Sequence, residues 1–178
     1  MGDCITTFSK RHMTPSAPKP EDLRIEDIAH ALSLMVRANG HFPRFYSVGQ
    51  HCIHCCGEAH ARGYTKRVQL ACLLHDASEA YLADITRPVK QHLPRYRKIE
   101  AGLQAAVFEK YLGVLTAGEE RIWRELDDLL LYYEFKHFMG EELMDCPGAL
   151  KSSPVFDTEP FSATEQTYLD WFRRLREG

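Results

Sequence analysis

The sequence predicts an all-α protein with a single domain. Apolar residues recur at spacings of three and four along several segments, glycines stand just beyond the ends of these segments, and no alternating apolar run bounded by turn signals competes as a strand. With 178 residues, of which 44% are hydrophobic, the chain can bury one sizeable core. We therefore expect one helical bundle of about six main helices over residues 23–178, after an extended N-terminal lead-in over residues 1–22.

The first part of the chain is expected to hold the lead-in and two helices. Residues 14–22 contain three prolines and little apolar material, which favours an extended segment. Apolar residues at helical spacing over residues 25–36 predict the first helix, and Asn39-Gly40 ends it. Ser47 can cap a second helix, which runs to about Arg62 and is followed by a glycine.

The third predicted helix is central to the bundle. It covers residues 66–83 and is apolar on most sides, as expected for a helix surrounded by others. Pro88 and Pro94 confine the next stretch to loop or short turns. A fourth helix follows over about residues 96–112 and is closed by Gly113.

Two capping boxes predict the starts of the last two helices. Thr116-Ala-Gly-Glu119 opens a long helix whose apolar stripe extends to Tyr133. Gly140 and a Cys-Pro-Gly sequence bracket a loop-rich segment. Ser162-Ala-Thr-Glu165 then opens the final helix.

The overall charge and hydropathy exclude several classes of function. Twenty-two Lys and Arg against 25 Asp and Glu give a net charge of -3, so no global positive field holds a nucleic-acid polymer. No apolar stretch approaches the ~20 residues that cross a membrane. The N-terminus has no apolar segment of signal-peptide length, so we expect a cytoplasmic protein whose six cysteines are thiols.

The segment HDASEAYLAD, residues 75–84, carries four ionisable groups within an otherwise apolar helix. Buried carboxylates are normally paired, protonated or bound to a metal, and the adjacent imidazole of His75 makes a metal site a concrete expectation. Two ligands seldom suffice for an ion. His51 and Asp127 lie on other helices among apolar neighbours, and an antiparallel bundle permits them to reach the same ion. Taken singly, each is more often a core histidine or a solvated aspartate.

The order of these residues resembles a known family. The series His51, His75-Asp76 and Asp127 has the H…HD…D pattern of the HD-domain metal-dependent phosphohydrolases. Within that superfamily, HDASEAYLADITRPVK (residues 75–90) and FYSVGQH (residues 45–51) look like the bacterial 5′-deoxynucleotidase branch and its bacterial and phage relatives. The similarity runs from about residue 25 to residue 139, and it implies an HD-type helical domain.

The resemblance implies one divalent metal ion held by His51, His75, Asp76 and Asp127, with positions left for water and a phosphate oxygen. Mixed nitrogen and oxygen ligands suit Mn, Co, Fe, Ni or Zn, and Mg is a further candidate for the ion. Asp127 is preferred to Asp128 because the aspartate of the family precedes an apolar run and a tyrosine.

The resemblance also implies roles for the residues around the ion. Glu79 and Asp84 would assist proton transfer, and Asp76 and Asp127 would also contact the substrate. Arg37 matches, within a one-residue gap, an arginine that orients the phosphate. The residues implied to surround the nucleotide are Asp84, Ile85, Thr86 and Arg87.

Two positions depart from the family pattern, and one further arginine is a candidate for the site. Relatives often carry Pro-Thr where this chain has Thr86-Arg87, so an extra cation is expected to face the phosphate. Gln50 replaces a common glutamate, and if that glutamate orients His51, the amide oxygen of Gln50 can still accept its hydrogen bond. Arg44 is a second candidate for contact with phosphate.

The cysteines of the segment His51-Cys52-Ile-His54-Cys55-Cys56 allow a rival zinc hypothesis. Zinc ribbons and fingers need a second ligand pair, which this chain lacks, so small buried thiols are the better interpretation.

The leading hypothesis is an enzyme, a phosphohydrolase that converts nucleoside 5′-monophosphates, with deoxynucleotides preferred, to nucleoside and phosphate. One alternative keeps the site and changes the substrate to a phosphodiester or a guanosine polyphosphate. Another is a catalytically inactive helical module that binds a metal or a nucleotide. The expected partner is a nucleotide, and the family analogy is compatible with a homodimer.

Overall fold

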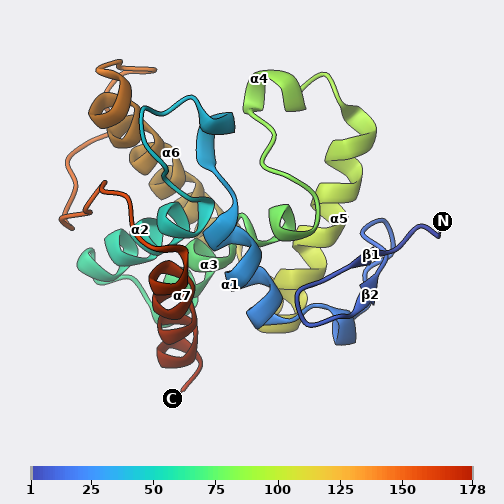
Figure 1. The fold of residues 1–178 in the computed structure, drawn as a ribbon. Helices are drawn as coiled ribbons and strands as arrows, with labels where there is room; N and C mark the ends of the chain where they lie inside the picture. The colour runs from blue at the N-terminus through green and yellow to red at the C-terminus, as the bar shows by residue number, and fades with distance from the viewer. Residues whose placement is uncertain (1, 178) are drawn as a thin grey trace.

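The computed structural model describes residues 2–177 and confirms the all-α prediction (Figure 1). Short 3-10 helices, labelled η, and one two-stranded sheet accompany the α-helices. The helices are α1 (Ile25–Leu34), α2 (Val48–Ala61), α3 (Lys66–Leu74), α4 (Arg87–Lys90), α5 (Pro94–Tyr111), α6 (Ala117–Met139) and α7 (Phe161–Arg176). Six of them are the main helices expected, and α4 is a single turn.

The N-terminal segment is more ordered than the predicted extended lead-in. β1 (Ile5–Thr6) pairs antiparallel with β2 (His12–Met13), and η1 (Pro20–Asp22) follows. The expectation of no strand was wrong here, because strands of two residues are too short to show an alternating pattern. Ser9, in the turn between the strands, donates two hydrogen bonds to the buried Asp27 of α1, which fixes the hairpin to the bundle.

The core lies where α2 and α3 pack together, with α1, α6 and α7 around them (Figure 1). Gly49 permits the close approach of α2 to α1, because a Cβ atom there would lie 3.2 Å from the backbone of Leu32. This approach fixes the N-terminal half of α2, which carries His51 at the centre of the bundle.

Of the three predicted serine or threonine caps, the structure confirms those at Ser47 and Thr116 and contradicts the one at Ser162. Ser47 caps α2 as expected, and Gln50 completes a capping box there, while Thr116 and Glu119 form the predicted capping box at the start of α6. The predicted box over residues 162–165 was wrong, because the residue before the helix is Pro160 and α7 begins at Phe161, two residues earlier than a cap at Ser162 would give. The carboxylate of Glu165 instead lies 3.0 Å from His30 of α1, so a tertiary contact takes the group that a local cap would use.

The central helix predicted over residues 66–83 is broken at His75-Asp76. α3 ends at Leu74, Asp76 has non-helical dihedral angles (φ -101°, ψ 12°), and η3 (Ala77–Tyr81) follows. The Nδ1 atom of His75 lies 2.7 Å from the carbonyl oxygen of Cys72 and donates to it, so this carbonyl has a partner although the helix does not continue. The break lets two adjacent side chains turn towards one point, which a continuous helix would hold about 100° apart.

The cysteines are free thiols, as predicted, and four of them, Cys52, Cys55, Cys56 and Cys72, are buried. Across residues 2–177, none of the helices combines the length and the apolar character that a membrane crossing requires.

Candidate metal centre

Side chains from three parts of the bundle converge at one point. His51 comes from α2, His75 and Asp76 come from the break after α3, and Asp127 comes from α6. The Nε2 atoms of the two histidines are 3.2 Å apart, and Asp127 Oδ1 lies 3.1 Å from that of His51 and 3.7 Å from that of His75. Asp76 Oδ2 lies 3.3 Å from His75 Nε2 and 3.9 Å from His51 Nε2. The residues predicted to hold a metal therefore lie together.

These separations suit a shared ion. Ligand atoms about 2.1 Å from one metal ion are about 3.0 to 3.4 Å apart in octahedral or tetrahedral coordination. The nitrogen and oxygen atoms of the cluster already lie close to this spacing, so small side-chain adjustments bring them to it.

The second nitrogen of each imidazole is held by a partner outside the cluster. His51 Nδ1 lies 2.6 Å from Glu134 Oε1, and His75 Nδ1 lies 2.7 Å from the carbonyl oxygen of Cys72. A carbonyl oxygen or an ionised carboxylate accepts a hydrogen bond, so in each histidine Nδ1 is the donor. The Nε2 lone pairs of the neutral rings are thereby directed into the cluster, which is the tautomer and orientation that metal-binding histidines need.

Glu134 is a functional candidate that the sequence interpretation missed. Its side chain is fully buried on α6, and besides His51 it accepts hydrogen bonds from Arg37 Nε (2.8 Å) and the Tyr46 hydroxyl (3.0 Å). Burial alone would raise the pKa of Glu134, but Arg37 and His51 outweigh burial and lower it to about 2. The available signal was a lone carboxylate in an apolar run, two helical turns after Asp127 and on the same helix face.

The expected role of Gln50 beside His51 was wrong. The amide oxygen of Gln50 completes the capping box with the backbone N–H of Ser47, and its amide nitrogen donates to the carbonyl oxygen of Asp157. Because residue 50 points back along the start of α2, the partner of His51 comes from another helix.

Arg37 lies beside the cluster, buried in η2 (Arg37–Gly40). Its Nε atom is fixed by Glu134, while its two terminal nitrogens lie 3.6 Å from Asp76 Oδ2 and 3.8 Å from Asp127 Oδ1. These two distances exceed those of good hydrogen bonds, so the terminal nitrogens retain donor capacity towards the cluster. Burial would lower the pKa of Arg37, but Glu134, Asp76 and Asp127 raise it, and the guanidinium stays charged.

The histidines and aspartates of the cluster shift each other's pKa values. Burial would raise the pKa of Asp127 and Asp76, but the imidazoles lower both. In His75, burial lowers the pKa and the two aspartates raise it well above its usual range. In His51, burial and then Arg37 lower the pKa, while Glu134 and Asp127 produce a net increase. The cluster thus attracts positive charge, as protons or as a metal cation.

Two buried thiols also lie at the cluster. Cys55 Sγ is 3.5 Å from His51 Nε2, so His51, Cys55 and His75 form one group of close donor atoms, and Cys52, His75 and Asp76 form another. This buried His, Cys and Asp group can hold a metal ion. Burial raises the pKa of both Cys52 and Cys55, and nearby carboxylates add to the increase, so the ionised aspartates are the better ligands.

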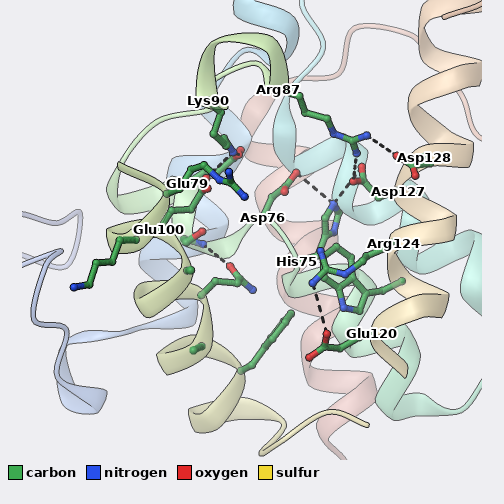
Figure 2. Close-up of a pocket in the computed structure, with 18 of the residues that line it drawn as sticks. His75, Asp76, Glu79, Arg87, Lys90, Glu100, Glu120, Arg124, Asp127 and Asp128 are labelled. Carbon is green, nitrogen blue, oxygen red and sulfur yellow. Dashed lines mark hydrogen bonds and ion pairs between the residues drawn. The ribbon is translucent and has the colours of Figure 1, made fainter. Parts of the chain in front are cut away.

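A cleft of about 840 Å³ opens from the cluster and lies between α5 and α6. His75, Asp76 and Asp127 form part of its wall (Figure 2). Arg87, from α4, crosses the cleft and donates to Asp127 Oδ2 at 2.7 Å and to Asp128 Oδ1 at 2.6 Å. Asp128 therefore contacts Arg87, while Asp127 faces both Arg87 and the histidines.

Glu79 lines the same cleft from η3. Lys90 Nζ lies 3.3 Å from Glu79 Oε1 and 2.6 Å from Glu100 Oε1, whereas Glu79 Oε2 is buried without a hydrogen-bond partner among the described residues (Figure 2). Burial, followed by Asp76 and Asp84, raises the pKa of Glu79 well above its usual range. Burial also raises the pKa of Asp84. Both groups therefore hold a proton more readily than ordinary carboxylates.

The remaining predicted residues lie further from the cluster. Ile85 and Thr86 belong to the loop between η3 and α4 and are not among the residues that line the cleft, so their contact with a substrate stays a prediction. Arg44 is exposed and pairs with Asp157 at 3.2 Å, away from the histidines.

Two bacterial proteins are similar to this chain in sequence. It is 38% identical over 107 residues to the uncharacterized protein YfdR of Escherichia coli (strain K12), and this match covers 60% of the chain and 57% of YfdR. It is 35% identical over 141 residues to the uncharacterized protein RCAP_rcc00048 of Rhodobacter capsulatus, covering 75% of the chain and 71% of that protein. No family model matches the chain. Neither relative's name states an activity, so any chemistry must be argued from the site.

Proposed function

The chain belongs to the same family as the uncharacterized Rhodobacter capsulatus protein RCAP_rcc00048, and we propose that it is a metal-dependent phosphohydrolase of the HD-domain type that hydrolyses nucleoside 5′-monophosphates. One observation carries this proposal. Two imidazole Nε2 atoms and two aspartate oxygens converge at separations of 3.1 to 3.9 Å, and both Nδ1 atoms have partners elsewhere.

In this proposal His51, His75, Asp76 and Asp127 hold one divalent ion. Their mixture of nitrogen and oxygen atoms suits Mn, Co, Fe, Ni or Zn, with Mg less favoured because it prefers oxygen ligands. When bound, such an ion polarises a phosphoryl oxygen and lowers the pKa of water. Glu134 supports the site by keeping His51 in the required tautomer, and Asp76 and Asp127 face the substrate side of the site as well.

Arg37 would bind the phosphate. Its guanidinium is fixed at Nε by Glu134, so the two terminal nitrogens keep one orientation towards the cluster. A rigid guanidinium can donate to two phosphate oxygens at once, which a lysine cannot do in the same geometry. Arg87 would exchange its present contacts with Asp127 and Asp128 for a further phosphate oxygen.

Glu79 would act as the general acid. Burial and the neighbouring aspartates raise the pKa of Glu79, which favours its protonated form, and the unpartnered Oε2 would give a proton to the leaving oxygen of the nucleoside. Asp84, whose pKa is also raised, would assist the same transfer from the loop before α4.

Phosphomonoesters are the favoured substrates. A terminal phosphate carries two charges and offers free oxygens to Arg37 and Arg87, whereas a diester offers one charge and less room. The similarity of residues 75–90 to the 5′-deoxynucleotidase branch supports a nucleoside as the leaving group.

A guanosine polyphosphate remains a second candidate substrate. Arg97, Lys98 and Arg124 line the cleft in addition to Arg87 and Lys90, and these cations favour a ligand with a second phosphate group.

A phosphate-release assay with purified protein and added divalent metals tests the proposal. We expect 5′-monophosphates to be hydrolysed well ahead of 3′-monophosphates, cyclic dinucleotides, guanosine polyphosphates and bis-p-nitrophenyl phosphate. Arg37→Ala should remove much of this preference, and exposed Arg44→Ala is the matched control. Faster hydrolysis of the diesters, or an unchanged ranking in Arg37→Ala, would contradict the proposal. Absence of hydrolysis with every metal would favour the inactive binding module.

A further inference from the structure

We propose that the wall of the cleft formed by Ala101, Ala105 and Phe108 of α5 and Trp123 of α6 binds the planar base of the nucleotide, with Trp123 as its main contact. The inference rests on the proposed function for the phosphate end of the ligand. The inference assigns the residues that would contact the base and so distinguish a nucleotide from a sugar phosphate.

The shape of this wall suits a flat ring. Ala101 and Ala105 lie one helical turn apart on the same face of α5, and both line the cleft. Their small side chains leave space between α5 and α6 that larger residues would fill. Phe108 lies three residues after Ala105 on α5 and also lines the cleft. Its ring is edge-on to that of Trp123, with the ring centroids 6.4 Å apart. The wall therefore ends in two aromatic rings.

Trp123 also lies at the right distance from the cluster. It precedes Asp127 by four residues, so both project from the same face of α6. The centroids of the Trp123 and His75 rings are 5.6 Å apart. A ligand whose phosphate lies at the histidines and aspartates can therefore extend its sugar and base along the wall without leaving the cleft.

The polar atoms of the cleft support the same assignment. In the part of the chain that the structure describes, two buried side-chain atoms lack a hydrogen-bond partner, Trp123 Nε1 and Glu79 Oε2, and both residues line this cleft. Buried N–H groups in folded proteins are normally paired. A ring nitrogen or carbonyl oxygen of a base can accept from Trp123 Nε1 after a small rotation of the indole. The Arg124 guanidinium lies over the Trp123 ring, 4.4 Å from its centroid, and places a cation at the same end of the cleft.

Tryptophan fluorescence tests this inference directly, because the chain contains two tryptophans. Trp171 is on α7, beside His60 and Arg174, and does not line the cleft. The Trp171→Phe protein therefore has Trp123 as its only tryptophan. Deoxyadenosine 5′-monophosphate should quench its fluorescence immediately after mixing, whereas 2-deoxyribose 5-phosphate, which lacks the base, should not. Equal quenching by both ligands, or by neither, would overturn the inference.

Kinetics provide a second test with the same pair of substrates. Trp123→Leu should lower kcat/KM for the nucleotide relative to the base-free sugar phosphate by roughly 5- to 150-fold, the range expected for loss of one base–aromatic stack. Trp123→Phe, which keeps a ring and removes the N–H, should cause a smaller change in the same ratio. An equal decrease for both substrates would instead make Trp123 a structural support of His75.

The two experiments separate this inference from the proposed function. Quenching by the nucleotide alone, without hydrolysis under any metal condition, would support the base subsite and contradict the phosphohydrolase. Hydrolysis of both substrates would support the phosphohydrolase. If quenching were then not selective and the ratio of the two kcat/KM values were unchanged in the Trp123 variants, the base subsite would be contradicted.

Discussion

Two fully buried glutamates of this protein, Glu58 and Glu134, have contrasting surroundings. Both side chains are 0% exposed. Glu58, on α2, accepts hydrogen bonds from the backbone of Lys151 and Ser152, from the Ser152 hydroxyl and from Arg62. Glu134, on α6, binds His51, Arg37 and Tyr46. Three of the four donors to Glu58 belong to a loop, whereas two partners of Glu134, His51 and Arg37, belong to or contact the cluster of histidines and aspartates.

The difference indicates how burial of a carboxylate can serve structure or chemistry. Around Glu58, two of the four donor groups are the backbone N–H groups of Lys151 and Ser152 and a third is the Ser152 hydroxyl, so its hydrogen bonds fix the segment near residue 151 onto α2. Around Glu134 the donors are side chains, and the remaining polar atoms of two of them, His51 and Arg37, face His75, Asp76 and Asp127. A buried charge whose partners are themselves oriented towards one point is therefore the better sign of a functional site.

The largest expected effect comes from removal of a proposed metal ligand. Asp76→Ala and Asp127→Ala should each abolish metal binding and reduce turnover to background, while the helical content stays intact. Metal content by mass spectrometry and circular dichroism check this. Asp128→Ala is the matched control, because Asp128 contacts Arg87 and no histidine. Wild-type metal content in Asp76→Ala would contradict the four-ligand proposal, and loss in Asp128→Ala alone would mean that the wrong aspartate was chosen.

Removal of the proposed proton donor should have the next largest effect. Glu79→Gln should keep the metal and bind the nucleotide, yet lower kcat by about 100-fold or more, because an amide of the same shape cannot deliver the proton. Measurement of kcat and of nucleotide affinity separates the two roles. A variant that loses affinity and keeps its turnover number would make Glu79 a binding residue.

The comparison between the two glutamates gives a paired prediction. Glu134→Gln should weaken metal affinity by about 10- to 100-fold, since His51 loses a charged partner at Nδ1. Glu58→Gln should leave metal affinity unchanged, because its partners do not reach the cluster. Titration of both apoproteins with the same metal measures this difference. Equal affinities in the two variants would remove the distinction drawn between the glutamates.

Metal affinity should also depend on pH. The carboxylates raise the pKa of His51 and His75 in the metal-free protein, so protons compete for both Nε2 atoms at higher pH than they would for an ordinary histidine. Affinity should therefore rise as pH increases through these raised pKa values and fall in acid. Metal titrations over a series of pH values check the trend. An affinity independent of pH would show that the histidines are not ligands.

The smallest expected effect concerns stability at Glu58. Burial would raise the pKa of this carboxylate, but its bonds to Ser152, Lys151 and Arg62 lower it, so ionised Glu58 stabilises the fold above its unfolded pKa and this contribution is lost as pH falls. Glu58→Gln should lower the free energy of unfolding by about 1 to 3 kcal/mol at neutral pH. The gap to wild type should shrink in acid, as urea denaturation at two pH values would show. A gap that widens in acid would contradict the assigned sign.

The sequence by itself determined the helical class, most helix boundaries and the residues of the cluster. Helical periodicity is local, and the capping boxes at Ser47 and Thr116 use groups within one turn, so both are readable from short segments. The set of His51, His75, Asp76 and Asp127 was readable through the resemblance of their order to the HD-domain pattern, because a match of residue types and order does not require knowledge of distances.

Only the tertiary structure decided how these residues are held. Glu134 became the partner of His51 because α6 packs on α2, and no local signal excludes Gln50 from that role. At the break after Leu74, His75 contacts His51 and Asp127 from other helices, and Glu165 contacts His30 instead of forming its predicted cap. In each case the deciding contact joins residues distant in the chain, and such contacts exist only once the helices have packed.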